Sequence, residues 1–407
     1  MLRLLLFVIV LLLAEYYTLS AIKVVFENTN FQKIAFGIHW TFTALFVVLI
    51  VIFFAGYRPE GSLRGIIMGF TFMLLFGKMV VMTFMLFGDI AIFVQWIIGK
   101  FSSSDASNSL LQSSRSNFLS KTALIAATFP IAIFTYGMIR NPYRYQIKNV
   151  SLKLPKLPKA LAGLKIVQIS DIHSGSFGNK EKIEAGIAKI NAINADYVFF
   201  TGDIVNEYYT EMQPWIDTFK KIKAKKKVYS VLGNHDYGDY GLPAGATKEE
   251  NMIGMRKVHR DLGWELLLDR HERIKTPDGD LAIIGIENCS SDKRFHTYGD
   301  LAKAYKGCED CKVKLLLSHD PSFWDSKITK EFKDIDVTFS GHTHGAQFGI
   351  EKGNFKWSIS QYLYKQWSGL YTKGNQHIYT NVGFGFIGYH GRVGILPEIT
   401  VFEFGKG

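Results

Sequence analysis

Long apolar runs dominate the first 140 residues, whereas the rest of the chain mixes apolar and polar positions. Four of these runs come close to or exceed the roughly 20 residues that a helix needs to cross a bilayer. We predict that residues 1–140 form a transmembrane region with spans at residues 4–22, 36–56, 65–98 and 122–139. As one helix the third run would be roughly 50 Å long, so it must tilt, break or extend past the bilayer. A serine-rich loop, residues 101–120, is predicted to join the last two spans.

Four ionisable residues lie at or near membrane depth: Glu15, His39, Lys78 and Asp89. Because charge is costly in hydrocarbon, such residues indicate a functional site, or they pair with neighbouring helices or reach the interface. Four spans place both ends of this region on one side of the membrane. Lys and Arg near the span ends are more frequent on that side, which favours a cytoplasmic location for the C-terminal region.

The chain becomes polar and proline-punctuated at residues 141–160, where we predict a linker. In residues 161–407, short β-branched runs alternate with amphipathic pieces of helix length, which is the pattern of an α/β domain. Such a domain is large enough to bury a core. We predict six buried strands, at residues 165–170, 197–201, 228–232, 281–285, 313–317 and 335–339.

Polar residues able to bind metal follow five of these six strands. They are Asp171 and His173, then Asp203, then Asn234 with His235 and Asp236, then His319, and finally His342 and His344. Singly, each could be a helix cap or a buried core histidine. Ligands bind outside the carboxyl ends of strands in α/β sheets, so five such ends together predict one metal-binding site.

His342 and His344 are two residues apart, and glycines flank the pair. In an extended segment the two rings would point the same way, with Cα atoms about 7 Å apart. The flanking glycines would let other backbone approach closely.

The chain of 407 residues has a net charge of +11 and contains three cysteines. The charge is compatible with nucleic acid, acidic substrates or an anionic membrane, and the spans make the lipid bilayer the simplest partner. Three cysteines exclude a disulfide framework. Cys308 and Cys311 form a C-x-x-C without the second pair of a four-ligand zinc site, which favours a local disulfide or two free thiols.

The motifs Asp-x-His, Gly-Asp, Gly-Asn-His-Asp, a later His and Gly-His-x-His follow one another over residues 165–345. In this order they resemble the calcineurin-like metallophosphoesterases, and residues 381–402 resemble the closing strands of membrane-associated bacterial members. The resemblance implies an αββα sandwich, in which helices flank two mixed sheets. It also implies an integral protein of a bacterial cytoplasmic membrane.

The same resemblance implies two divalent or trivalent metal ions. Two sets of residues would bind them: Asp171, His173, Asp203 and His344 for one ion, and Asp203, Asn234, His319 and His342 for the other. Asp203 would bridge the ions, and His235 would be the catalytic residue beside them. Mixed nitrogen and oxygen ligands favour Mn, Fe or Zn over Mg.

Two dications and two carboxylates leave a charge of about +2, which attracts a phosphate ester. We expect a hydroxide that bridges the metals to attack phosphorus, while His235 stabilises the transition state or protonates the leaving oxygen. The substrate would be a phosphodiester, pyrophosphate or phosphomonoester, with a lipid as one candidate. Position 206 is Asn, where many family members have an Asp that orients the catalytic histidine, which puts activity on poor leaving groups in question.

Two alternatives are a nuclease of the same family and a non-catalytic membrane receptor or sensor. Membrane anchoring argues against nucleic acid, and the complete ligand set with His235 argues against a receptor. Seven aromatic residues near the motifs could line an apolar pocket or belong to the core: Tyr362, Tyr364, Trp367, Tyr371, Phe384, Phe386 and Tyr389. The sequence leaves the particular metals, the substrate and the oligomeric state open.

Overall fold

The computed structural model describes residues 2–54, 62–101, 109–353 and 355–405. The chain divides into two compact units. The first consists of Met1–Pro59 with Ile66–Tyr136, and the second of Glu60–Gly65 with Gly137–Gly407.

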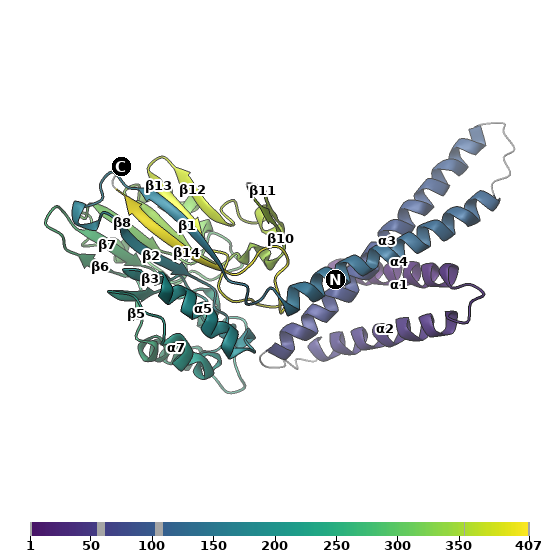
Figure 1. The fold of residues 1–407 in the computed structure, drawn as a ribbon, viewed down its shortest axis with the longest axis horizontal. Helices are drawn as coiled ribbons and strands as arrows, with labels where there is room; N and C mark the ends of the chain where they lie inside the picture. Colours follow the sequence, from purple (N-terminus) through teal and green to yellow (C-terminus); the bar gives the residue numbers. More distant parts are fainter. Residues whose placement is uncertain (1, 55–61, 102–108, 354, 406–407) are drawn as a thin grey trace. The chain divides into compact units, whose positions relative to one another are not determined.

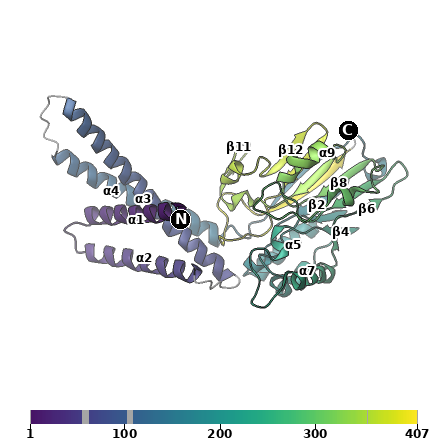
Figure 2. The same ribbon diagram turned by 180° about the vertical axis from the view of Figure 1, so that it is seen from behind.

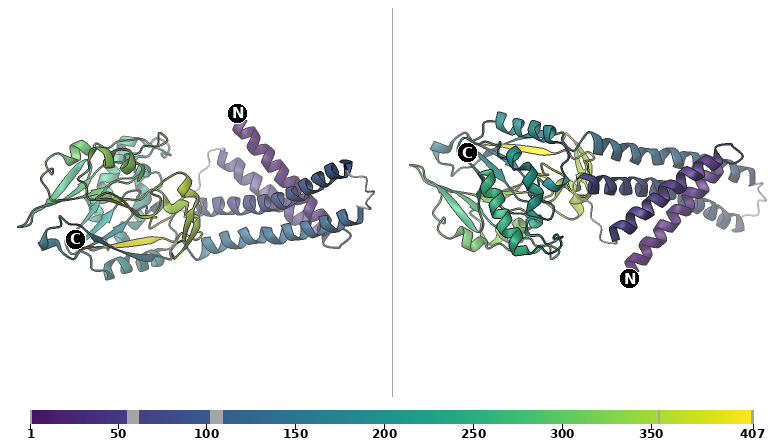
Figure 3. Two further views of the ribbon diagram at one scale, coloured as in Figure 1. Left: turned by 90° about the horizontal axis from the view of Figure 1, so that it is seen from above. Right: turned by 90° about the horizontal axis from the view of Figure 1, so that it is seen from below.

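Four long helices make up the first unit (Figures 1 and 3). They are α1 (Leu2–Val25), α2 (Gln32–Phe54), α3 (Ser62–Phe101) and α4 (Ser109–Ile139). Each contains a stretch long and apolar enough to cross a membrane: Leu5–Val25, Gln32–Ile52, Leu63–Ile98 and Ser116–Ile139. The prediction of four apolar helices is confirmed.

The serine-rich segment differs from the prediction, because α4 begins at Ser109. Residues 102–108 of the expected loop lie outside the described residues, and the rest is helical. α3 is one uninterrupted helix of 40 residues, so the third span extends rather than breaks.

Each of the four ionisable residues predicted in the spans has a partner on another helix. The Glu15 carboxylate on α1 accepts hydrogen bonds from Lys78 on α3 and from Thr43 on α2, the latter at 3.1 Å, and also contacts the His39 ring. The Tyr17 hydroxyl donates to Asp89 at 2.8 Å. Pairing of this kind reduces the cost of polar groups at membrane depth.

The second unit contains two six-stranded mixed sheets. The first has the order β1 (Gln146–Lys153), β14 (Glu398–Gly405), β2 (Leu164–Ile169), β3 (Tyr197–Phe200), β4 (Lys227–Ser230) and β5 (Glu265–Leu266). The second has the order β12 (Gly369–Lys373), β13 (Gln376–Thr380), β9 (Val337–Ser340), β8 (Val313–Leu317), β7 (Leu281–Gly285) and β6 (Arg270–Ile274). A separate antiparallel pair consists of β10 (Gly349–Lys352) and β11 (Phe355–Ser358).

The two sheets pack face to face, and helices cover their outer faces (Figures 1 and 2). In β3, Phe199 packs into the core between the sheets, whereas Val198 and Phe200 pack under the helical layer. That layer includes α5 (Lys180–Ala192) and α7 (Lys248–Leu262), and α8 (Leu301–Tyr305) covers the other sheet. Burial on both faces explains the uninterrupted apolar runs. The predicted αββα sandwich is confirmed.

Residues 141–160, expected above to be a linker, contain β1. This strand pairs in parallel with β14 over its whole length, from Gln146 opposite Glu398 to Lys153 opposite Gly405. It is an edge strand with mostly exposed or half-buried side chains, so its sequence reads as polar although its backbone belongs to the sheet. The three prolines of the segment lie outside it.

Cys289, Cys308 and Cys311 are buried free thiols. Of the two alternatives for the C-x-x-C, the structure therefore has free thiols. Burial raises the pKa of Cys308 to about 12 and that of Cys289 to about 12, so neither is a thiolate near neutral pH.

Candidate metal centre

Loops that follow five strands come together at one edge of the sandwich. β2, β3 and β4 run parallel in the first sheet, and β7, β8 and β9 run parallel in the second, so their carboxyl ends share an edge. The predicted site residues are at this edge, and six of them form two groups of side chains that could each hold a metal ion. The sixth predicted strand, β7, contributes none of the predicted ligands.

The first group consists of Asp171, His173 and His344. His344 Nε2 lies 3.0 Å from His173 Nε2 and 3.2 Å from a carboxylate oxygen of Asp171. Ligand atoms on one ion, bound at about 2.0 to 2.2 Å, are roughly 3 to 3.5 Å apart, so the spacing fits a metal. His173 Nδ1 faces the carbonyl of Val205 at 3.1 Å, an orienting contact typical of metal-binding histidines.

The second group consists of Asp203, His319 and His342, with Asn234 beside them. His319 Nε2 lies 3.1 Å from Asp203 Oδ2 and 3.2 Å from Asn234 Oδ1. Asn234 Oδ1 also lies 2.7 Å from His342 Nδ1, and the Asn234 amide donates to the Tyr240 hydroxyl at 2.9 Å. That hydrogen bond turns the amide oxygen toward the two histidines, as a ligand would require.

Asp203 lies between the two groups. Its Oδ2 is 3.1 Å from His319 Nε2 in one group and 3.6 Å from His173 Nε2 in the other. Its Oδ1 accepts a hydrogen bond from the backbone N–H of His235 at 2.8 Å. A carboxylate in this position fits the bridging role that the family resemblance implies.

Buried charge makes this edge favourable for cations. Burial disfavours charge on both Asp171 and His319, yet the neighbouring imidazoles hold the pKa of Asp171 below its usual range. The carboxylate of Asp203 raises the pKa of His319 to about 10. Two fully buried carboxylates therefore create a negative potential that attracts positive charge.

Five of the seven predicted ligands have left-handed backbone conformations, with φ of 52° at Asp171, 48° at His173, 60° at Asp203, 72° at His342 and 51° at His344. Non-glycine residues in this region cost energy, and they cluster at functional sites. The expectation that His342 and His344 sit on an extended segment and point the same way is wrong. β9 ends at Ser340, and the turn that follows directs the two rings into different groups.

Two motif glycines allow close packing at the site, and one of them, Gly341, flanks the histidine pair for which the sequence predicted it. A Cβ at Gly341 would lie 1.9 Å from Ser170 Oγ and 2.3 Å from Asp171 Oδ2. A Cβ at Gly233 would lie 2.2 Å from Asp203 Oδ1. Any side chain at either position would displace a proposed ligand or its support.

His235 lies beside the two groups and belongs to neither of them. Its ring centroid is 5.0 Å from that of His173, and it lines the same pocket. Its Nδ1 donates a hydrogen bond to the backbone carbonyl of Asn206 at 2.6 Å, which leaves Nε2 to face a bound molecule. The side chain of Asn206 instead exchanges hydrogen bonds with Ser176.

Two carboxylates, the buried Asp236 and the half-buried Glu211, support this region by accepting hydrogen bonds from backbone N–H groups. Asp236 accepts hydrogen bonds from Gly233, Asp203, Ile204 and Val205 at 2.8 to 3.3 Å. Glu211 accepts hydrogen bonds from Asn206, Glu207 and Tyr208 at 2.7 to 3.3 Å. Asp236 is therefore a structural residue that fixes the loops of Asp203 and His235.

The two groups open into a pocket of about 240 Å³. Sequence reasoning missed three residues near them: Arg294 and Phe295 line the pocket, and Tyr240 holds Asn234. They lie outside the motifs, so no local pattern marks them. Of the seven aromatic residues named above, Tyr364 lines the pocket, whereas Phe384 and Phe386 belong to the core under α5 and α7.

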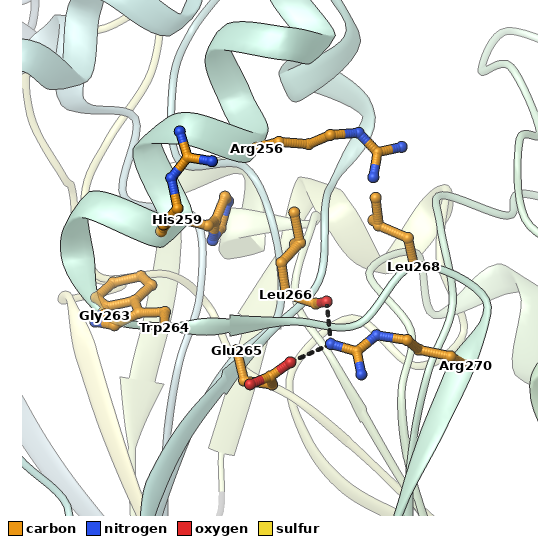
Figure 4. A pocket seen from close by; sticks show the side chains of 9 residues that line it. Arg256, His259, Gly263, Trp264, Glu265, Leu266, Leu268 and Arg270 are labelled. Atoms are coloured by element: carbon orange, nitrogen blue, oxygen red, sulfur yellow. Dashed lines mark hydrogen bonds and ion pairs between the residues drawn. The ribbon is translucent and has the colours of Figure 1, made fainter.

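A second pocket, of about 500 Å³, lies where α7 leads into β5 (Figure 4). Arg256, Arg260 and Arg270 are among its lining residues, and Arg270 is bound to Glu265 and to the Leu266 carbonyl. It contains none of the predicted site residues, so it is distinct from the metal centre.

The sandwich and the clustered histidines and carboxylates define a metal-binding phosphoesterase. Residues 164–346 match the family described as "Calcineurin-like phosphoesterase", and residues 2–142 match "Probable Calcineurin-like phosphoesterase, transmembrane domain". The chain belongs to the calcineurin-like phosphoesterases and is an integral membrane protein.

Three relatives illustrate this similarity. A "Transmembrane protein with metallophosphoesterase domain" from Danio rerio is 25% identical over 69% of this chain and 62% of its own length. The "Uncharacterized metallophosphoesterase YkuE" of Bacillus subtilis is 28% identical over 66% of this chain and 88% of its own length. The "UDP-2,3-diacylglucosamine pyrophosphatase LpxG" of Chlamydia muridarum is 23% identical over 60% of this chain and 82% of its own length. The match thus spans less than two thirds of the Danio rerio protein.

Proposed function

We propose that the chain is a membrane-anchored phosphoesterase that uses two metal ions to hydrolyse a phosphodiester, pyrophosphate or phosphomonoester. The observation that carries this proposal is the pair of side-chain groups on either side of Asp203, in one pocket with His235. A receptor would need neither the second group nor a histidine placed beside both.

Asp171, His173, Asp203 and His344 would hold one ion, and Asp203, Asn234, His319 and His342 the other. Two bound ions of this kind lower the pKa of a shared water and polarise the phosphoryl oxygens. The ligand set of imidazole, carboxylate and amide oxygen suits Mn, Fe or Zn.

His235 would act on the leaving group. Because its Nδ1 proton is committed to the Asn206 carbonyl, the protonated ring presents a second proton on Nε2. Hydrolysis consumes one water: one of its protons passes to solvent, its oxygen bonds to phosphorus, and the bond between phosphorus and the leaving oxygen breaks. That oxygen takes up the proton from Nε2.

The side of the membrane and the cellular source belong to the same proposal. The Lys and Arg distribution around the spans supports a cytoplasmic metal domain, and the similarity to a Bacillus subtilis protein supports a bacterial cytoplasmic membrane. Labelling of an exposed engineered cysteine, Ile253→Cys, in intact cells and in inverted vesicles tests this side. Labelling in intact cells would place the domain outside.

A lipid substrate is compatible with the membrane anchor and with a relative whose name includes a diacylglucosamine pyrophosphatase. A nuclease has less support. Arg294 is the one basic side chain among the described residues that line the metal pocket. Binding of nucleic acid, a polyanion, relies on several Lys or Arg side chains.

The test is turnover by the full chain in detergent or nanodiscs, with Mn²⁺, on an aryl phosphodiester, nucleotides, phospholipids and nucleic acid. We expect metal-dependent hydrolysis that His235→Ala abolishes or severely reduces, and two bound ions per chain. Hydrolysis without metal, or full activity of His235→Ala, would refute the mechanism. Fewer than two ions and no turnover would favour the receptor alternative.

A further inference from the structure

Between residues 141 and 405, exposed apolar side chains are concentrated in one stretch, residues 349–353 and 355–370, here named the apolar segment. Nine large apolar side chains are exposed among the described residues from 141 to 405, and three of them, Ile147, Ile253 and Tyr298, lie elsewhere. The other six belong to the apolar segment: Ile350, Phe355, Ile359, Tyr362, Leu363 and Leu370. Apolar surface gathered in this way indicates contact with another apolar phase.

The apolar segment is bound directly to the loop of the metal centre. The Tyr364 hydroxyl lies 2.8 Å from His342 Nε2. Ser358 Oγ donates to the Gly345 carbonyl at 2.6 Å, and Thr343 Oγ1 donates to the Trp367 carbonyl at 2.7 Å. These three contacts fix the apolar segment to the loop that carries two proposed ligands. A membrane or protein that covers the segment would therefore lie next to the metal centre.

One side chain joins the pocket to the exposed surface. Leu363 lines the metal pocket together with Ser360 and Tyr364, and it is also 64% exposed. Tyr362, which is 73% exposed, precedes it in the chain. The pocket wall therefore continues into apolar surface, which a water-soluble phosphate ester would not need.

The charges of the segment suit a lipid surface. It contains Lys352, Lys356 and Lys365 against one acidic residue, Glu351. The side chain of Lys365 is 84% exposed, and Lys356 pairs with Glu351 at 3.1 Å. Apolar and aromatic side chains combined with lysines are typical of segments that lie in the membrane interface, where lysines meet anionic headgroups.

We propose that the apolar segment inserts into the interfacial layer of the bilayer, and that the substrate is an amphiphilic phosphate ester. The apolar part of this substrate stays in the bilayer while its phosphate reaches the metal pocket beside Leu363. We favour the bilayer over another protein as the partner of the apolar segment, because this chain is itself an integral membrane protein. The substrate part rests on the proposed phosphoesterase function.

Membrane contact can be measured directly with single labels on the full chain in lipid nanodiscs. Phe355→Cys and Tyr362→Cys would each carry an environment-sensitive fluorophore, and Ile253→Cys on α7 is the matched control, because Ile253 is 64% exposed. The native cysteines are buried and serve as an unlabelled background.

We expect blue-shifted emission and quenching by doxyl-labelled lipids at positions 355 and 362, with neither effect at position 253. Blue-shifted emission without lipid quenching would mean that protein, such as a second copy of the chain, covers the segment. Emission unchanged from that of position 253 would mean that water covers it. Either result would overturn the proposal.

Turnover tests the substrate class. The double variant Phe355→Ser with Tyr362→Ser changes two exposed residues that do not line the pocket, and Ile253→Ser is the control. We expect kcat/KM for a phosphate-containing lipid in vesicles to fall about tenfold or more, because two apolar side chains no longer enter the interface. With a soluble aryl phosphodiester, kcat/KM should stay unchanged.

Equal kcat/KM of the double variant and the wild type on the lipid would overturn the inference while leaving the phosphoesterase function intact. An equal loss on both substrates would also overturn it, since the change would then affect the site itself. Absence of turnover by the wild type on either substrate would refute the proposed function, and the labelling experiment would still decide membrane contact.

Discussion

Replacement of His235 by Asn tests its role as the acid that protonates the leaving oxygen. The structure holds Nδ1 on the Asn206 carbonyl at 2.6 Å and keeps His235 outside both metal groups. Loss of the ring should therefore remove one proton donor and leave the ligands in place. General acid catalysis contributes about 10² to 10⁴-fold, which corresponds to about 2.7 to 5.4 kcal/mol of activation free energy.

The size of the loss should depend on the leaving group. A nitrophenolate departs without a proton, so His235→Asn should lose about tenfold or less in kcat on a nitrophenyl diester. An alkoxide needs the proton, so the loss on an alkyl ester should reach the full 10² to 10⁴-fold.

Metal analysis provides the control, because the variant should still bind two ions. Equal losses on the two esters would refute proton donation and indicate a purely electrostatic role. Loss of metal would show that His235 is a ligand.

Three further predictions concern the metals, the loops and the membrane helices. His342→Ala and His344→Ala should each retain about one ion per chain by elemental analysis, and loss of both ions in either would contradict the split into two groups. Asp236→Asn should destabilise the metal domain by about 2 to 6 kcal/mol, since its new amide leaves two buried N–H donors unpaired, and an unchanged melting temperature would contradict this. Lys78→Met should lower the melting temperature by removing the lysine that pairs with the Glu15 carboxylate, and adding Glu15→Gln should restore most of it.

The convergence of the site could be predicted because it depends on topology. Parallel strands present their carboxyl ends at one edge, so short polar motifs after five apolar runs had to meet there. Asp171 and His319 illustrate this, since they lie 148 positions apart in the sequence yet act on each other electrostatically. The grouping of the ligands came from the resemblance, because the extended-strand argument for His342 and His344 did not hold.

Features set by tertiary packing could not be predicted. Tyr362 and Tyr364 are close in sequence and alike in chemistry, yet the first is 73% exposed and the second is buried against His342. The polar strand β1 resembles a linker because an edge strand needs few apolar side chains. Exposure of this kind depends on the neighbours of each side chain, which lie far away along the chain.

With Asn at position 206, His235 is held by a backbone carbonyl rather than by an aspartate side chain. The backbone carbonyl of Asn206, which is neutral, holds the His235 ring, and Glu211 fixes this loop by accepting hydrogen bonds from three backbone N–H groups. Burial raises the pKa of Glu211 to about 7, so the support itself is sensitive to pH near neutrality. Because the Asn206 carbonyl holds Nδ1, the other ring nitrogen, Nε2, would be the one to donate a proton to the leaving oxygen.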